Sequence, residues 1–318
     1  MAGLPKTKKI NMLYVKKHLT GWVKMFLFFY FAVSAGVVYA GVGTTGADFL
    51  NINVGGRASA FCGAYSAVSG DVYSTQYNPA GIAKIEDREI ALMHNEWMLD
   101  TRFEFLAVGI PLFDSGLGLS VKYFDMGEFA GRNNFGQKID DFTANDQSVN
   151  VSYGRLVGRR FSFGASVKYI KQTIASKSSS GFALDAGMNV ELITDNLTLA
   201  VVAKNLGPKL SAYNTEKVEL PQSYTVGIQA KPDSENFQLT TDMTIPKGGD
   251  AELSIGFERK VIDMLALRAG LEFGSHKEDS FNWCLGIGLH IWDYSLDYSF
   301  EPVKDLDSAH RISISVKF

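Results

Sequence analysis

Apolar and polar residues alternate along most of the chain, starting near Arg88. The C-terminal stretch shows an apolar row formed by Ile312, Ile314, Val316 and Phe318. The residues between them are serine or lysine. A period of two is typical of a β-strand with one apolar and one polar face, whereas an amphipathic helix repeats every 3.6 residues. The pattern therefore predicts an all-β fold for this part of the chain.

The alternation predicts fourteen antiparallel strands bounded by turn residues. They span residues 88–98, 102–112, 116–126, 147–157, 160–171, 181–192, 196–205, 222–231, 236–245, 251–260, 263–273, 281–291, 293–300 and 309–318. Most of them are close to the length of about ten residues that a tilted strand needs to cross a bilayer.

The connections between these strands differ in length in a regular way. Those after the even-numbered strands are tight, whereas those after strands 3, 5, 7, 11 and 13 are longer and more polar. The first connection is an exception, because it falls on the long side and is short. Short turns at one end and long loops at the other, with an even number of strands, are typical of an outer-membrane barrel with both termini in the periplasm.

The polar row of the predicted strands carries charges of both signs. These residues are Lys122, Lys168, Asp185, Glu191, Lys204, Asp242, Glu258, Arg268, Glu272, Asp297 and Arg311. A lysine or arginine that faces lipid at mid-depth costs roughly 2–4 kcal/mol, so the charged row is expected to face the lumen. Closing the sheet pairs the backbone groups of its edges. We therefore expect a transmembrane antiparallel β-barrel over residues 88–318.

Two N-terminal segments lack the alternation. Residues 1–40 are expected to be a signal peptide, because the apolar run Met25–Val38 follows several lysines and is too short for a spanning helix. Cleavage is expected after Ala40. Residues 41–87 are rich in Gly, Ala and Ser. We expect them to form a plug in the lumen, since a barrel of this size encloses more space than its own side chains fill.

Composition narrows the class of protein. The net charge is -3, which indicates no nucleic-acid partner. A mean hydropathy of +0.00 excludes a membrane protein built from long apolar helices, but not a membrane barrel. Cys62 and Cys284 are the two cysteines. They form no disulfide framework, and we expect two free thiols.

No catalytic or metal-binding motif is present. The sequence has no nucleophile elbow, no zinc-protease helix motif and no Cys-x-x-Cys pair. His290 lies on the lumen row near Asp297 of the next predicted strand, where a hydrogen bond is expected rather than catalysis. We therefore expect no enzyme activity, no cofactor and no metal ion.

The plug contains the short motif "YNPAGIA". Asn78 before Pro79 predicts the start of a helix, with Asn78 as its N-cap and Pro79 at the first helical position. A functional alternative is that Asn78, Pro79, Ala80 and Gly81 line a ligand path.

Several stretches carry a family resemblance. They include "GVGTTGADFLNINVGGRASAF", "HNEWMLDTRFEF", "AKNLGPKL", "LPQSYTVGI" and "YSLDYSFEPVKDLDSAHRISISVKF". In this order they resemble the PorV/PorQ family of outer-membrane proteins, within the wider FadL-like group of long-chain fatty-acid transporters. Asn78, Pro79 and Ala80 match the plug motif of those transporters, and the C-terminal row ending at Phe318 resembles the signal that the outer-membrane assembly machinery recognises.

The resemblance implies a fourteen-stranded barrel with an N-terminal plug in the bacterial outer membrane. PorV-like members work with the type IX secretion system, whereas FadL-like members take up hydrophobic molecules passively. The expected partners are therefore outer-membrane lipid, the barrel assembly machinery, and either secretion components with exported cargo or hydrophobic small molecules. A purely structural barrel is a third possibility.

Overall fold

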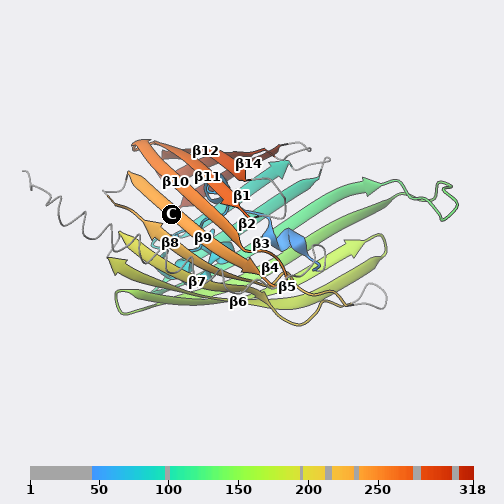
Figure 1. Ribbon diagram of the computed structural model, residues 1–318, viewed down its shortest axis with the longest axis horizontal. Helices are drawn as coiled ribbons and strands as arrows, with labels where there is room; N and C mark the ends of the chain where they lie inside the picture. The colour runs from blue at the N-terminus through green and yellow to red at the C-terminus, as the bar shows by residue number, and fades with distance from the viewer. Residues whose placement is uncertain are drawn as a thin grey trace, which may run out of the picture. The chain divides into compact units, whose positions relative to one another are not determined.

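The computed structural model describes residues 45–96, 101–193, 196–211, 217–232, 236–274, 281–302 and 308–318. The predicted signal peptide, residues 1–40, lies outside the described residues. Within them, fourteen antiparallel strands form a closed barrel in which each strand pairs with its neighbours in the chain (Figure 1). The barrel closes where β14 pairs with β1, with Ile314 opposite Leu92. The predicted fold class is therefore confirmed.

The strands have the following bounds. They are β1 Glu89–Glu96, β2 Arg102–Leu112, β3 Ser115–Phe129, β4 Phe142–Val157, β5 Phe161–Ile174, β6 Lys177–Ile193, β7 Leu197–Leu206, β8 Ser223–Ala230, β9 Phe237–Pro246, β10 Glu252–Ile262, β11 Leu265–Phe273, β12 Asn282–Ile291, β13 Tyr294–Glu301 and β14 Ala309–Lys317. We call the end of the barrel with the tight connections, such as residues 113–114 and 292–293, the turn end. The opposite end is the loop end.

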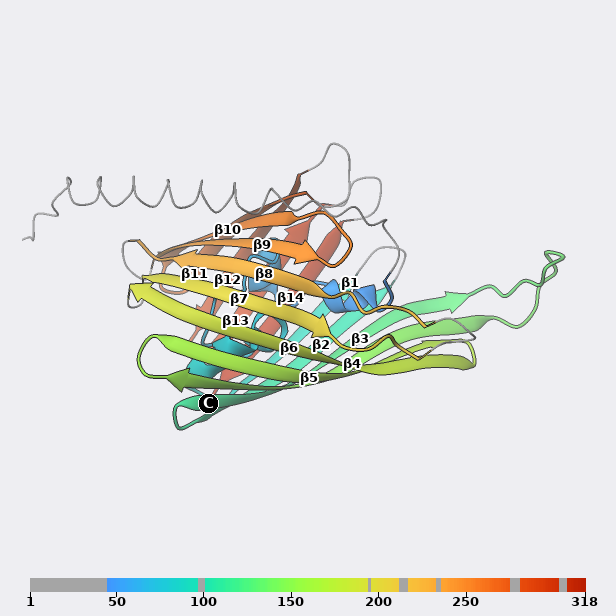
Figure 2. The same cartoon turned by 60° about the horizontal axis from the view of Figure 1, so that its bottom comes forward.

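The strands β3 to β6 are longer than the sequence pattern predicts. The prediction of a long loop after the fifth strand is wrong: β5 continues to Ile174 and β6 begins at Lys177. The ladder includes a pair between Thr173 and Ser178. These mainly polar residues show no alternation, although their backbones remain paired. The longer strands extend beyond the rest of the loop end (Figure 2).

The two faces of the barrel have opposite character. On the outer face, Val151 and Ile287 expose 53% and 47% of their surface, and many other large apolar side chains are similarly exposed. On the inner face, Lys168 and Arg268 are each only 3% exposed. The charged row therefore faces the lumen and the apolar row faces outward, as the alternation predicts.

Residues 45–87, which we call the plug, contain four short helical elements. These are η1 Asp48–Asn51, α2 Gly56–Ala60, α3 Ser74–Tyr77 and η2 Pro79–Lys84. Helix α2 contacts β11 to β14, and η2 contacts β2 to β6, so the plug reaches opposite walls of the lumen. No helix in the described ranges is long and apolar enough to cross a membrane.

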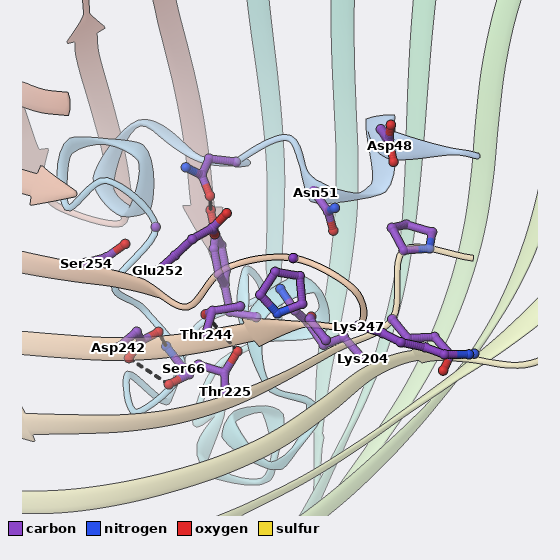
Figure 3. Close-up of a pocket in the computed structure, with 18 of the residues that line it drawn as sticks. Asp48, Asn51, Ser66, Lys204, Thr225, Asp242, Thr244, Lys247, Glu252 and Ser254 are labelled. Carbon is purple, nitrogen blue, oxygen red and sulfur yellow. Dashed lines mark hydrogen bonds between the residues drawn. The ribbon is translucent and has the colours of Figure 1, made fainter. Parts of the chain in front are cut away.

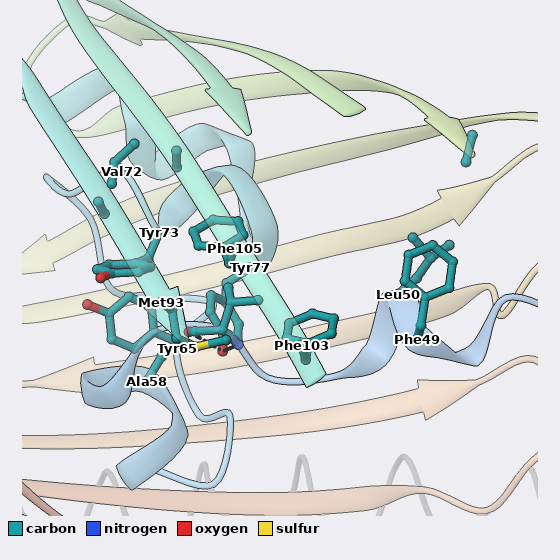
Figure 4. Packing of buried hydrophobic residues seen from close by; sticks show 14 of the residues in the cluster. Phe49, Leu50, Ala58, Tyr65, Val72, Tyr73, Tyr77, Met93, Phe103 and Phe105 are labelled. Atoms are coloured by element: carbon teal, nitrogen blue, oxygen red, sulfur yellow. Dashed lines mark hydrogen bonds between the residues drawn. The ribbon is translucent and has the colours of Figure 1, made fainter. Parts of the chain in front are cut away.

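A buried aromatic cluster joins the plug to the first strands. Tyr65, Tyr73 and Tyr77 of the plug lie against β1 and β2 (Figure 4). The ring of Tyr73 stacks on that of Phe105, with 6.0 Å between centroids. Met93 of β1 accepts a hydrogen bond from the backbone N–H of Gly55. Apolar packing therefore fills this side of the lumen.

The expectation of two free thiols is wrong. Cys62 of the plug is bonded to Cys284 of β12, with their Cα atoms 5.7 Å apart. The two cysteines are 222 residues apart in the chain, so sequence spacing gives no sign of the bond. They meet because the small residues Gly270 and Gly286 let the plug backbone lie against β11 and β12.

Candidate functional site

The plug and the wall around it form the candidate site, because they determine what can enter the lumen. The first anchor is the motif at Asn78. Its side chain accepts a hydrogen bond from the backbone N–H of Ala80, and Pro79 occupies the first turn of η2, as the capping pattern predicts. The amide of Asn78 also donates to the backbone oxygen of Ser66 and to Asn189 of β6, at 2.8 and 2.6 Å. Asn78 thus joins two parts of the plug to the wall.

A row of glycines makes room for η2 on the wall. Gly116, Gly154, Gly164 and Gly187 lie on the neighbouring strands β3 to β6. A Cβ atom at Gly154 would lie 2.7 Å from the backbone oxygen of Pro79, closer than such atoms approach in proteins. The glycines therefore form a flat surface against which the plug backbone packs. Sequence alternation placed them on the lumen face but could not show what they contact.

The second anchor is an ion-pair network on the opposite wall. Arg57 of α2 donates to both carboxylate oxygens of Glu258, at 2.9 and 2.7 Å. Glu258 also accepts from Arg268, at 2.6 Å. Arg268 in turn donates to Asp297, at 2.5 Å. Charges that the sequence places in the lumen are thus largely neutralised by each other and by the plug.

Within the plug, Arg57 also lies 3.9 Å from Asp71. The hydroxyl group of Tyr65 donates a hydrogen bond to Asp71. Burial raises the pKa of Tyr65 well above its usual value, and the negative charge of Asp71 raises it further. The phenol therefore stays protonated and remains a donor at every physiological pH.

The remaining lumen charges hold the plug backbone. Asp242 of β9 accepts from the N–H groups of Tyr65 and Ser66 and from the hydroxyl of Ser66, at 3.0, 2.8 and 2.7 Å. Lys122 of β3 donates to the backbone oxygen of Leu50, at 2.7 Å. Charged side chains that are aligned with backbone dipoles make strong hydrogen bonds, so these contacts fix the path of the plug.

A cavity of about 360 Å³ lies between the plug and the wall at the loop end (Figure 3). Plug residues from Thr45 to Tyr77 line one side, and strands β7 to β11 line the other. Most of the residues that line it carry hydroxyl, amide, carboxylate or ammonium groups, while polar atoms and carbon atoms contribute about equally to its surface. The cavity can therefore satisfy the hydrogen bonds of a polar guest.

Glu219 joins three segments beside this cavity. Its carboxylate lies 3.2 Å from the ammonium groups of both Lys209 and Lys247. Its backbone oxygen accepts from the N–H of Gly46, at 2.8 Å. The β7–β8 connection, the β9–β10 turn and the start of the plug therefore meet at one residue.

The plug motif singled out in the sequence lies apart from this cavity. Asn78, Pro79, Ala80 and Gly81 are buried in η2 against β3 to β6, and the cavity is lined by other residues. Their role in a ligand path stays a prediction. The sequence missed the cavity because its lining comes from distant segments and has no local motif.

The C-terminal row lies on the outer face of β14. Ile312 and Ile314 are 51% and 43% exposed, and the N–H of Phe318 donates to the backbone oxygen of Arg88. Its role as an assembly signal stays a prediction. His290 lies half-buried on β12, with Ser295 as its cross-strand partner. Among the described residues, no group of three or more His, Cys, Asp or Glu side chains could hold a metal ion.

Comparison with sequence families gives one family match. Residues 34–191 match the model of the uncharacterised protein family UPF0164. A UPF0164 protein of Treponema pallidum (strain Nichols) is 23% identical over 290 residues, which cover 83% of this chain and 67% of the relative. The resemblance to the PorV/PorQ family remains a prediction from the motifs.

Several solved transporters and channels share this architecture. The toluene transporter TbuX of Ralstonia pickettii has a TM-score of 0.61 at 12% identity, over 84% of this chain and 98% of its own. The toluene transporter TodX of Pseudomonas putida has a TM-score of 0.62 at 14% identity, over 83% and 97%. The monoaromatic hydrocarbon channel CymD has a TM-score of 0.61 at 14% identity, over 84% and 98%. At these identities the likeness establishes the fold, which this chain shares with all three.

Proposed function

We propose that the protein is an integral barrel of the bacterial outer membrane that transports small molecules across it. The observation that carries this proposal is the distribution of side chains. Large apolar residues cover the outer face, while lysine, arginine and carboxylate side chains are buried in the lumen. In water, an apolar outer surface of this extent would cause aggregation; in lipid, it is the surface that the hydrocarbon requires.

The plug determines how transport can occur. It is bonded to β12 through Cys62 and held on other strands through Asn78, Arg57 and residues 65–66. Beside these contacts, a cavity lies between the plug and the wall at the loop end. Transport therefore proceeds by binding at the loop end followed by a local rearrangement of the plug, and not by free diffusion through a fixed channel.

Hydrophobic uptake, the alternative from the FadL-like resemblance, requires an apolar path between plug and wall. Most of the residues that line the cavity are polar, and the apolar part of the plug is packed against β1 and β2. These observations support a transport role without supporting a hydrocarbon substrate. The similar structures are toluene transporters and a monoaromatic hydrocarbon channel, and these substrates belong to those proteins.

Refolding into lipid tests the proposal. The mature chain, refolded in detergent, is expected to insert into liposomes and to become protected from added protease over β1 to β14. Planar-bilayer recordings should show little steady conductance, because the plug fills the lumen. A folded monomer that stays dispersed in buffer and does not enter liposomes would overturn the proposal.

A secretion role is the second candidate, and the long strands β3 to β6 favour it. They run to 14–17 residues, which is more than a bilayer requires. The hairpin between β3 and β4 carries Phe135 and Ile139, which are 89% and 50% exposed. Such a projecting surface suits a partner protein or exported cargo, as the PorV/PorQ resemblance implies.

Replacing residues 130–141 with a two-residue turn separates this candidate from transport. If the barrel works in secretion, partners that co-purify from detergent-solubilised membranes should be lost from the shortened protein while its insertion into liposomes is unchanged. Replacement of residues 158–160 at the turn end serves as the control. Recovery of the intact barrel without partners, in repeated preparations, would count against a secretion role.

A further inference from the structure

The cavity at the loop end is open to a ligand in the part of the chain that the structure describes. Asp48 and Asn51 of η1 lie at its edge, and Asp242, Thr225 and Ser66 lie deeper (Figure 3). The cavity adjoins the β7–β8 and β9–β10 connections, so a solute can reach it from the loop end. Its volume of about 360 Å³ is in the lower part of the range of small-ligand sites, roughly 300–1,000 Å³.

The lining identifies the polarity of the guest. Hydroxyl groups come from Thr225, Thr244 and Ser254, and amide groups come from Asn51 and Asn53. Apolar surface makes up about half of the lining and comes from two prolines, the ring of Tyr77 and the carbon atoms of the polar side chains. A hydrocarbon in this cavity would displace water without replacing its hydrogen bonds, which is unfavourable. A hydrophilic solute can replace them.

The charges of the lining also indicate the sign of the charge that a guest should carry. Four carboxylates line the cavity, from Asp48, Asp242, Glu252 and Glu272. They are accompanied by two ammonium groups, from Lys204 and Lys247. The formal balance is therefore an excess of two negative charges, and a cavity with walls of low dielectric constant focuses this field on its contents.

Some charged residues of the lining are engaged by other groups, whereas Asp48 is exposed at the mouth of the cavity. Asp242 is engaged by the backbone of residues 65–66, and Lys247 pairs with Glu219 beside the cavity. Asp48 accepts a hydrogen bond from Thr45 at 2.9 Å and is exposed at the mouth. A cationic group that enters from the loop end thus meets Asp48 first. Further along the lining it meets the carboxylate of Glu252, which also interacts with the ammonium group of Lys204.

We propose that this cavity binds a small, hydrophilic solute with a positive charge, of a volume no larger than that of roughly a dozen water molecules at about 30 Å³ each. An amine that also carries hydroxyl, amide or carboxyl groups fits this description. The biological meaning of the site rests on the proposed transport function, whereas the binding itself does not.

Calorimetric titration of the purified full chain in detergent tests the proposal with three probes. L-lysine represents a hydrophilic cation, L-glutamate a hydrophilic anion of similar size, and toluene an apolar solute. Saturable binding of L-lysine is expected, with L-glutamate at least tenfold weaker and toluene without effect on the L-lysine titration. Equal or tighter binding of L-glutamate or toluene would overturn the proposal.

Substitution locates the binding. The double variant D48N/E252Q keeps the size of both side chains and should weaken L-lysine binding at least tenfold. The matched control is Glu128→Gln, an exposed carboxylate of β3, outside the cavity lining, and its affinity should be unchanged. Unchanged affinity in the double variant would overturn the assignment of the site.

Insertion into liposomes, measured on the same proteins, separates the two proposals. A variant that still inserts has kept its fold, so its loss of L-lysine binding reports on the cavity. If the native chain inserts but does not bind L-lysine, the cavity proposal fails and the membrane proposal stands. If it binds L-lysine but does not insert, the membrane proposal fails and the cavity proposal stands.

Discussion

At the residue scale, single polar side chains fix the plug in the barrel. The N-cap role of Asn78 could be predicted, because a capping residue and a proline act within a few positions of each other. The pairing of Arg57 with Glu258 could not be predicted, because these residues are 201 positions apart and several other lumen carboxylates have the same pattern. Short-range chemistry was thus visible in the sequence, and long-range pairing was not.

Replacing Asn78 with alanine should loosen the plug. The change removes the N-cap and the bonds to Ser66 and Asn189, all of them buried. Loss of the cap and of buried partners should lower the free energy of unfolding by about 1–3 kcal/mol. Hydrogen exchange should rise in residues 66–84 and not in the strands. Asn134→Ala, at an exposed loop position, is the control, and equal effects of both changes would contradict the anchoring role.

Replacing Arg57 with glutamine should destabilise the contact between α2 and β10. Glu258 keeps its bond to Arg268 but loses the two bonds from Arg57. The side chain of Arg57 is 26% exposed, so the expected loss is about 1–3 kcal/mol, below that for a fully buried pair. Urea unfolding in detergent measures it. Arg132→Gln, in an exposed loop, should change the free energy of unfolding by less than about 0.5 kcal/mol.

At the scale of elements, strand positions were predictable and strand ends were not. Alternation marks a strand where one face is apolar, which holds for the central part of every strand. It fails in β5 and β6 near Ile174 and Lys177, where both faces are polar and the backbone ladder continues. The positions of the plug elements could not be predicted from the sequence. Gly and Ala residues indicate that the backbone packs closely, but they do not identify what it packs against.

The disulfide should act on the plug and not on the closure of the barrel. In the double variant C62A/C284A, β1 and β14 keep their full register, so the barrel should still form and insert. Removing the bond frees the plug from β12, and the expected loss of stability is about 2–5 kcal/mol. Calorimetric unfolding with and without reductant measures it. Reductant should lower the melting temperature of the native chain but not of the variant, and equal sensitivity of both would contradict this account.

The contact of Glu219 with three segments should depend on pH. Hydrogen bonds from Lys209 and then Lys247 hold the pKa of Glu219 below its usual value of 4.5. A lowered pKa means that the stabilising contact is complete above pH 4.5 and is lost as the pH falls through the lowered value. Amide exchange at Gly46 should therefore be slower in the native chain than in Glu219→Gln above pH 4.5. The difference should vanish in more acidic buffer, and a difference that persists there would contradict the assignment.

At the scale of the whole molecule, the sequence predicted most completely which face of the barrel is apolar and which is charged. The apolar face lies outside and the charged face lies in the lumen. Every strand carries the same two rows, so one inference about the lumen charges assigned both faces of the barrel at once. The cavity could not be predicted in this way. It is a space left between the plug and β7 to β11. It depends on how these elements pack together, which the sequence of a single strand does not indicate.

A lysine on the outer face tests the environment of the whole barrel. Ile287 lies in the middle of β12 and is 47% exposed, so in water Ile287→Lys would be nearly neutral. In a bilayer the same change should reduce stability by roughly 2–4 kcal/mol, because the ammonium group meets hydrocarbon at mid-depth. Phe113→Lys, in the β2–β3 turn and 95% exposed, should cost less than about 1 kcal/mol near the interface. Reversible urea unfolding in liposomes gives both values, and equal costs at the two positions would mean that β12 does not lie in lipid.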